Sequence, residues 1–237
     1  MNVYVAEILG TALLITLGNG VVANVILHKT KGNNGGLISI TLGWAMAVFV
    51  GVLVSANVSG AHLNPAVTVG LAVIGKFDWA LVPGYMLAQL IGSMIGALLV
   101  WIIYRQHFDE TADAATQLAV FSTAPSIRNA QHNFTSEFLA TFIFMLTILF
   151  ITKSSNSLGS LDALPVALVV LGIGLGLGGP TGYAINPVRD LGPRIMHSIL
   201  PIKHKGSSDW KYSWVPVFGP LAGAIAAAVL YQLIVTS

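Results

Sequence analysis

Long apolar stretches alternate with short polar linkers along the whole chain. A helix needs about 20 mostly apolar residues to cross the hydrocarbon core of a bilayer, and six stretches are long enough. They cover roughly residues 3–27, 37–57, 80–104, 134–152, 162–180 and 214–235. The linkers between them, such as residues 28–36, 105–117, 153–160 and 203–213, are rich in polar residues. The pattern predicts six transmembrane helices.

Two further apolar segments, about 64–76 and 186–199, are too short to cross a membrane, and each begins with Asn-Pro. Asn is a favoured helix N-cap, and Pro suits the first helical position because its missing N–H is not needed there. A single Asn-Pro would indicate an ordinary helix start. Inside apolar sequence, irregular backbone survives only when it is buried in protein or lines a water-filled cavity. The two segments are therefore predicted to be half-helices beside a cavity.

The two halves of the chain repeat each other. Residues 59–68 read SGAHLNPAVT and residues 181–190 read TGYAINPVRD, while Glu7 opens EILGT and Glu137 opens EFLAT. Each half has three spans, and an odd number makes the second half enter from the opposite side, so the repeat is inverted. The expectation is one all-α membrane channel domain over residues 1–237. It divides into repeat one at about 1–104, a loop at about 105–133, and repeat two at about 134–237.

Composition narrows the class of protein. Of the 237 residues, 55% are hydrophobic and 8% are charged, whereas a soluble domain has about 25% charged residues. The net charge of +2 is too small to indicate a nucleic-acid partner. No Cys is present, which excludes disulfides and thiol chemistry. No nucleophile motif or metal-ligand spacing occurs, so neither an enzyme, a metal nor a cofactor is expected. The first apolar stretch lacks a signal peptide's basic start and is expected to be retained.

The half-helices should bring chemistry to the bilayer midplane. Two helix N-termini and the carboxamides of Asn64 and Asn186 would meet there, offering positive dipole ends and N–H donors. Such a place suits water or hydroxyl groups and repels cations. Arg189, where the first repeat has Val67, is a functional candidate because an Arg at membrane depth is costly. A salt bridge with Asp190 is the alternative interpretation, and both can hold.

Three other polar residues lie near these segments. Glu7 and Glu137 are either buried acceptors that fix the loop before each half-helix or charges that reach toward an interface, and a proton relay is a weaker option. His62 precedes its Asn-Pro by two residues. It is expected to line a vestibule or simply to pack and hydrogen-bond.

These residues resemble the aquaporin family (major intrinsic proteins), and more closely its glycerol-facilitator branch, the aquaglyceroporins. The resemblance covers nearly the whole chain and rests on SGAHLNPAVT and on two Asn-Pro boxes in a six-span chain. It implies six tilted helices plus two half-helices, a homotetramer with one pore in each protomer, and cytoplasmic termini. With cytoplasmic termini, most Lys and Arg lie in linkers on the outer side of the membrane. The positive-inside rule alone therefore favours the reverse orientation.

The resemblance also implies a set of pore residues. Asn64 and Asn186 would line the pore centre, with Pro65 and Pro187 starting the half-helices. The outer constriction would combine Arg189 with the residues Trp44, Tyr183 and Gly174, and Asp190 is a further mark of the branch. A small residue at Gly174 would widen the filter, while Trp44 and Tyr183 would form an apolar corner for a carbon backbone. Two departures, Val188 for the usual Ala and Tyr183 for a frequent Phe, affect the exact substrate.

The function predicted from these features is a passive channel for glycerol and other small neutral solutes, with some water flow and exclusion of ions and protons. Urea, dihydroxyacetone, hydrogen peroxide or protonated lactic acid are further candidate solutes. The alternatives are a strict water channel and a channel for protonated short acids. A secondary transporter is more remote, because it needs a coupling-ion site and the spans hold almost no carboxylates. The predicted location is a bacterial plasma membrane.

Overall fold

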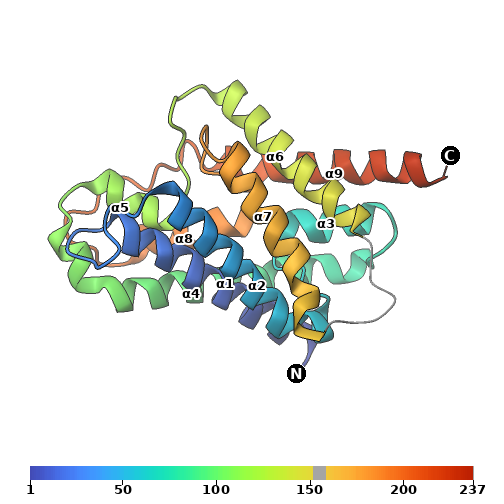
Figure 1. Ribbon diagram of the computed structural model, residues 1–237, viewed down its shortest axis with the longest axis horizontal. Coiled ribbons are helices and arrows are strands. Elements are labelled where there is room, and N and C mark those ends of the chain that lie inside the picture. Colours follow the sequence, from blue (N-terminus) through green and yellow to red (C-terminus); the bar gives the residue numbers. More distant parts are fainter. Residues whose placement is uncertain (152–158, 237) are drawn as a thin grey trace.

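The computed structural model describes residues 1–151 and 159–236, and these ranges are helical with no strand (Figure 1). The long helices are α1 (Val3–Ile26), α2 (Gly36–Ser59), α4 (Val82–Glu110), α6 (Ala130–Phe150), α7 (Leu164–Leu177) and α9 (Trp214–Thr236). The short helices are α3 (Pro65–Val73), α5 (Ala114–Phe121) and α8 (Pro187–Ile199), with 3-10 turns η1 (Trp79–Leu81) and η2 (Gly159–Ala163). Six segments are long and apolar enough to cross a membrane, which confirms the predicted six-helix fold.

Helix ends follow local sequence. Asn2 and Asn129 cap α1 and α6 by accepting hydrogen bonds from the N–H groups of Val5 and His132. α2 ends at Gly60, whose φ of +80° is left-handed and favours glycine. The half-helices α3 and α8 begin at Asn64-Pro65 and Asn186-Pro187, where the Asn side chain caps the helix and Pro occupies the first turn.

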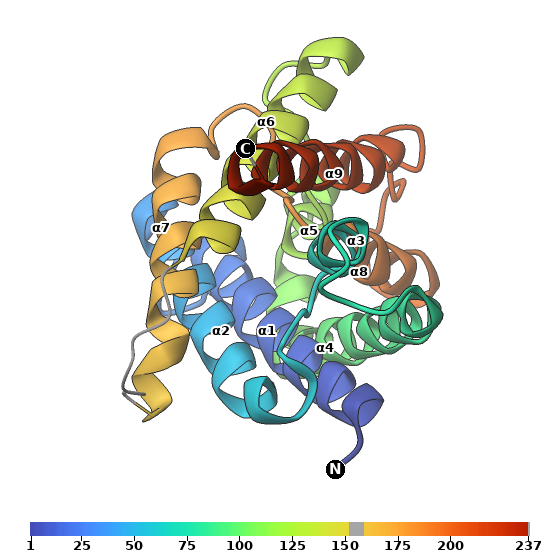
Figure 2. The same cartoon turned by 90° about the vertical axis from the view of Figure 1, so that its right-hand side faces the viewer.

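The two halves of the molecule exchange their half-helices. α1 packs against α2 and α4, and α6 packs against α9 and α7. α3 packs against α9 of the other half, whereas α8 packs against α4. In the view along the long axis, α3 and α8 lie one behind the other between α9 and α4, and they are in contact (Figure 2). This arrangement places both Asn-Pro boxes in the middle of the bundle.

Small residues allow the close crossings. A Cβ placed on Gly96 of α4 would lie 2.7 Å from the carbonyl oxygen of Ala12 on α1. In the other half, a Cβ on Gly219 of α9 would lie 2.9 Å from Cβ of Glu137 on α6. Both distances are too short for a real side chain, so glycine permits helix backbones to approach as membrane bundles require.

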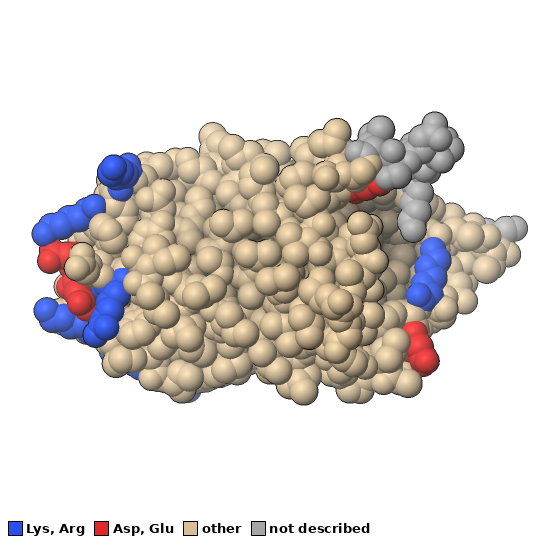
Figure 3. Space-filling view, turned by 90° about the horizontal axis from the view of Figure 1, so that it is seen from below, with Lys and Arg blue, Asp and Glu red and all other residues tan. Residues whose placement is uncertain are grey.

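The outer surface is that of an integral membrane protein. Large apolar side chains such as Ile38, Leu87 and Ile103 are exposed on the long helices. The face shown in Figure 3 has charged side chains at the two ends and an uncharged band between them. The described helices therefore present an apolar surface to lipid along most of their length.

The linker predicted at 105–117 is partly helical. α4 continues to Glu110, and α5 follows after Asp113, which caps it by accepting hydrogen bonds from the N–H (2.8 Å) and hydroxyl (2.6 Å) of Thr116. These bonds lower the pKa of Asp113. The helix is stable at this place because it buries Val120 and Phe121 in the core. The cap at Asp113 was the signal in the sequence. The linker predicted at 153–160 lies largely outside the described residues.

Candidate functional site

The loop before each half-helix has an unusual backbone. Ala61 and Leu63 have φ of +52° and +51°, and the repeat-equivalent Tyr183 and Ile185 have φ of +39° and +46°. Non-glycine residues avoid this left-handed region at a cost of about 1–2 kcal/mol each. The same strain at the same positions of both repeats requires a partner that holds the loops.

Glu7 and Glu137 are those partners. The Glu7 carboxylate accepts hydrogen bonds from Ser59 Oγ (2.6 Å), the N–H groups of His62 (3.0 Å) and Leu63 (2.7 Å), and Gln89 Nε2 (2.8 Å). Both carboxylates are fully buried, and a buried charge is tolerated only when it is well hydrogen-bonded. Neither residue reaches toward an interface.

Glu137 repeats the arrangement in the second half. It accepts hydrogen bonds from Thr181 Oγ1 (2.6 Å), from the N–H of Ala184 (2.9 Å) and from the N–H of Ile185 (3.0 Å). Thr181 replaces Ser59, and Ala184 and Ile185 replace His62 and Leu63. Because the carboxylates take the loop N–H groups, the loops keep one orientation in both halves.

Asn64 and Asn186 join the two loops to each other. Each side-chain oxygen caps its own half-helix, with Asn64 accepting from the N–H of Ala66 at 2.9 Å and Asn186 from Val188 at 3.1 Å. Asn64 Nδ2 donates to the carbonyl of Ile185, and Asn186 Nδ2 donates to the carbonyl of Leu63, both at 2.9 Å. Each amide has a second N–H that these bonds do not use. Val188 is buried and leaves the cap of its helix intact.

A cavity of about 180 Å³ runs past these residues. Its polar side is lined by both loops with Asn64, Asn186 and Arg189. Its apolar side comes from spanning helices and includes Leu14, Val48, Val52, Phe144, Val166 and Val170. A cavity with one polar and one apolar wall matches a solute that has hydroxyl groups on one side and carbon on the other.

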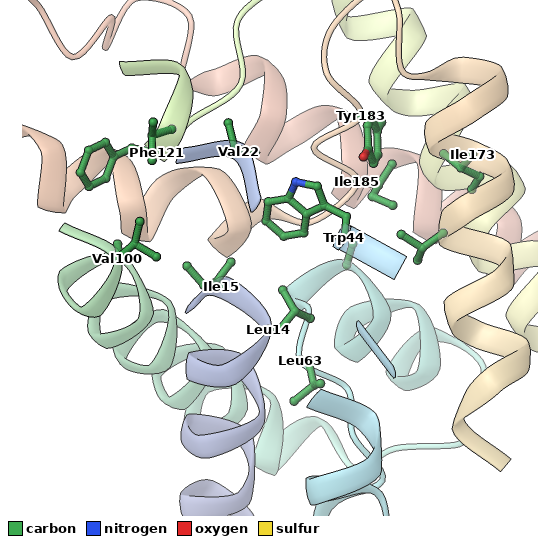
Figure 4. Close-up of a cluster of buried hydrophobic side chains, with 14 of the residues drawn as sticks. Leu14, Ile15, Val22, Trp44, Leu63, Val100, Phe121, Ile173, Tyr183 and Ile185 are labelled. Carbon is green, nitrogen blue, oxygen red and sulfur yellow. The ribbon is translucent and has the colours of Figure 1, made fainter. Parts of the chain in front are cut away.

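Arg189 and Trp44 form a polar–aromatic part of the cavity wall. The guanidinium carbon lies 4.1 Å from the centroid of the Trp44 ring, a favourable cation–π geometry. Both residues are buried, and Arg189 Nη1 has no hydrogen-bond partner among the described residues. Figure 4 shows the Trp44 indole and the Tyr183 ring in one cluster with Leu14 and Ile185. The geometry leaves a charged donor free beside two aromatic rings.

The Asp190 salt bridge has a different partner from the one considered in the sequence. Asp190 pairs with Arg194, with 2.7 Å between Arg194 Nε and Asp190 Oδ1, and both side chains are fully buried. Asp190 also accepts from the N–H and hydroxyl of Thr123. Arg194 donates to the carbonyls of Ser208, Asp209 and Thr123, so it fastens two loops to α8. The spacing of four residues on a helix was the signal for this pair.

The remaining predicted residues have different surroundings. His62 lines the cavity and also packs, with Nδ1 3.1 Å from Thr68 Oγ1 and its ring against Phe77 and Tyr85. Gly174 is not among the residues that line the cavity. A Cβ there would collide with the Thr41 methyl group and lie 2.9 Å from Tyr183 Cζ. Sequence reasoning missed Gln89, which binds both Glu7 and Thr68.

Six crossing helices around a cavity bordered by two re-entrant half-helices define a membrane channel. The major intrinsic protein family model matches residues 1–231, and the chain belongs to that family. This confirms the family prediction and the prediction that the chain is not an enzyme.

Relatives support the same branch. The chain is 52% identical over 232 residues to a probable glycerol uptake facilitator protein of Thermotoga maritima, covering 98% of this chain and 99% of the relative. It is 51% identical over 233 residues to a glycerol uptake facilitator protein of Streptococcus pneumoniae, with coverage of 98% and 99%. The structure of an aquaglyceroporin from Plasmodium falciparum matches with a TM-score of 0.87 and 36% identity, covering 98% of this chain and 96% of that one.

The Glu137 network predicts a specific loss of stability. In Glu137→Gln, the amide NH₂ faces an N–H or hydroxyl donor, so at least one buried donor loses its acceptor. The expected cost is about 1–3 kcal/mol, measured as a lower thermal unfolding midpoint in detergent. Glu110→Gln, which removes the charge from the exposed pair with Lys29, should change the midpoint little. Equal midpoints for wild type and Glu137→Gln would contradict this role.

Proposed function

We propose that the protein is a passive, bidirectional channel for glycerol and similar small neutral solutes, with some water flow. The observation that carries the proposal is the two-sided cavity, polar along the Asn-Pro loops and apolar along the spanning helices. Relatives of this chain that are named glycerol uptake facilitators support it. The glycerol carbons would lie against Trp44 and the aliphatic wall.

Successive polar groups would replace the water that a solute loses in the narrow region. Arg189 offers Nη1, which has no hydrogen-bond partner in the part of the chain that the structure describes. Asn64 and Asn186 each offer the N–H that the crossed bonds leave unused. The loop carbonyls are the acceptors that complete this polar wall. Because these groups are held before the solute arrives, little reorganisation is needed and flow can be fast in either direction.

The same groups would exclude cations and protons. Arg189 carries a fixed positive charge in the constriction, and α3 and α8 direct their N-terminal dipole ends to the same central region. At Arg189, Asn64 and Asn186 a hydrated cation would meet N–H donors, which cannot replace the oxygen ligands of its hydration shell. Electrostatic barriers of this type reject cations in narrow pores.

A coupled transporter fits the contacts less well. Within the described spans, Glu7 and Glu137 are the buried carboxylates, and each is occupied by donors that hold a loop. A coupling ion would have to displace these bonds and release the strained backbone. A strict water channel and a channel for protonated short acids such as lactic acid are outcomes that solute tests distinguish; urea, dihydroxyacetone and hydrogen peroxide belong in the same tests.

The proposed biological unit is a homotetramer in a bacterial plasma membrane with cytoplasmic termini. The orientation opposes the simple charge count. Several cations at the α5 end have interaction partners within the protein. Lys29 pairs with Glu110, hydrogen bonds to Asp209 raise the pKa of Arg128, and Lys205 Nζ donates to carbonyls at the end of α8. These contacts hold the cations at that end of the molecule, and the orientation itself is proposed from the family to which the chain belongs.

Stopped-flow light scattering on proteoliposomes tests the function. A glycerol gradient should give rapid shrinkage and then rapid re-swelling as glycerol enters, whereas a sorbitol gradient should give shrinkage only, because the larger polyol does not pass the constriction. Vesicles without protein are the control. Shrinkage with both solutes and no re-swelling would identify a strict water channel and overturn the proposal.

Arg189→Val tests ion exclusion. Loss of the fixed charge should raise proton leak by about tenfold or more, the change that a barrier lowered by roughly 1.4 kcal/mol gives. Proton entry is followed by a trapped pH-sensitive dye under an applied potential. Arg105→Val, at the exposed end of α4, removes a charge outside the cavity and should leave the leak unchanged. Equal leak in wild type and Arg189→Val would contradict the filter role.

Orientation can be tested because the chain has no Cys of its own. Single-cysteine variants Lys211→Cys and Lys76→Cys carry exposed thiols at opposite ends of the molecule. In intact cells, a membrane-impermeant maleimide should label Lys211→Cys and not Lys76→Cys, and cell lysis should expose the second. The reverse pattern would place the termini outside.

A further inference from the structure

The Tyr183 ring packs against three small residues, Thr41, Gly174 and Gly178, which together form its seat. Figure 4 shows this ring beside the part of α7 that carries Ile173. Thr41 of α2 lies next to the ring, and Gly174 of α7 and Gly178, the C-cap residue of α7, lie beneath it. The remaining side of the ring faces the cavity, which Tyr183 lines. The ring is thus held between two helices and open toward the solute path.

The Tyr183 ring fills the space in which a Cβ would stand at Gly174 and at Gly178. A Cβ on Gly178 would lie 2.5 Å from Tyr183 Cδ1 and 2.9 Å from Cε1. A Cβ on Gly174 would lie 2.9 Å from Cζ and 3.1 Å from Cε2. Two different edges of one ring therefore rest on glycines that are four residues apart, about one helical turn.

Backbone conformation does not explain the glycine at position 178. Its φ is −75° and its ψ is −19°, which any residue adopts. By contrast, Gly182 in the same loop has a φ of +80°. The space taken by the Tyr183 ring is what excludes a side chain at Gly178, together with the Gly174 carbonyl oxygen, 2.5 Å from the same Cβ position.

We infer that Gly178 and Thr41 are positioning residues that set the width of the constriction through the Tyr183 ring. With Gly174, they let the ring recede from the cavity into α7. Tyr183 is buried and its seat is full, so an added methyl group at position 178 can be accommodated only if the ring moves toward its open side. That side holds Trp44 and Arg189. Pore width at the constriction is thus set from behind the aromatic residue.

This assignment refines the role expected for Gly174. The absent side chain does not leave open space beside the solute, because Thr41 and Tyr183 fill it. The pore gains width because the aromatic ring withdraws. Position 178, which does not line the cavity, then matters as much as position 174. The inference rests on the proposed function, since it concerns selectivity among solutes that the same pore conducts.

The test compares glycerol and water permeability of Gly178→Ala in proteoliposomes. The ratio of glycerol to water permeability should fall by about tenfold, because a barrier raised by roughly 1.4 kcal/mol for the wider solute gives that change. A merely structural defect lowers the number of working channels and reduces both fluxes together. An unchanged ratio with folded protein would overturn the inference.

Gly176→Ala is the matched control. It lies in α7 between the two seat positions, and, apart from its own stretch of helix, no atom of the described residues lies within 4 Å of a Cβ built there. Its permeability ratio should equal that of wild type. If Gly176→Ala changed the ratio as much as Gly178→Ala, the cause would be α7 itself and the seat would be excluded.

A second background separates the ring from the backbone contact. In Tyr183→Ala the ring is gone, so adding Gly178→Ala should change the ratio by less than about twofold, as expected when the interacting partner is absent. An equal loss in both backgrounds would assign the effect to the Gly174 carbonyl and overturn the role of the ring. Thr41→Ser, which removes the methyl beside Gly174, should raise the ratio.

The wild-type arm separates this inference from the proposed function. Glycerol flux in wild type with an unchanged ratio in Gly178→Ala contradicts the seat alone. Absence of glycerol flux in wild type contradicts the proposed function. In that case the seat predicts that Tyr183→Ala opens the pore to glycerol and that Gly178→Ala does not, and failure of this difference overturns the seat.

Discussion

Two buried carboxylates determine the rest of this structure. Glu7 and Glu137 hold loops whose backbone would otherwise avoid its observed conformation, and the loops end at the Asn residues that start the half-helices. Charge burial is tolerated because each oxygen accepts hydrogen bonds from fixed donors. The carboxylates accept hydrogen bonds from the loop N–H groups. The other polar groups of the loops are therefore left for the cavity. The channel interior therefore depends on two groups that do not line it.

The inverted repeat makes this arrangement symmetrical, and a few substitutions break the symmetry beside the cavity. The crossed bonds between Asn64 and Ile185 and between Asn186 and Leu63 are nearly identical. Arg189 has Val67 as its equivalent, and Tyr183 has Ala61. One half of the pore thus gains a charge and an aromatic ring, while the other keeps small apolar residues. The charge and the aromatic ring are thus concentrated in one half of a symmetrical scaffold.

Much of the fold could be predicted because lipid imposes simple rules. Span length, odd numbers of spans in each half and the duplicated Asn-Pro boxes were sufficient for six helices and two half-helices. The short helix α5 was missed because its apolar residues form a single turn-length cluster within polar sequence, although Asp113 marks its start. A segment of eight residues is too short for apolar periodicity to predict a helix.

The site was predictable where chemistry is local and less so where it depends on packing. Asn64, Asn186 and Arg189 stand out as polar residues in apolar sequence, and the structure brings all three to one cavity. Gly174 was expected to leave open space, and only the packing of the folded chain shows that Thr41 and Tyr183 fill that space. Likewise, Arg194 is the partner of Asp190 because α8 turns it toward two loops that are distant in sequence.

The central claim is that a preformed pore, without a conformational cycle, carries solute across the membrane. The temperature and concentration dependence of glycerol entry into proteoliposomes tests this most directly. A pore predicts a shallow temperature dependence, close to that of diffusion in water, and a rate proportional to glycerol concentration. A steep temperature dependence with saturation at low concentration would indicate a carrier cycle and contradict the account.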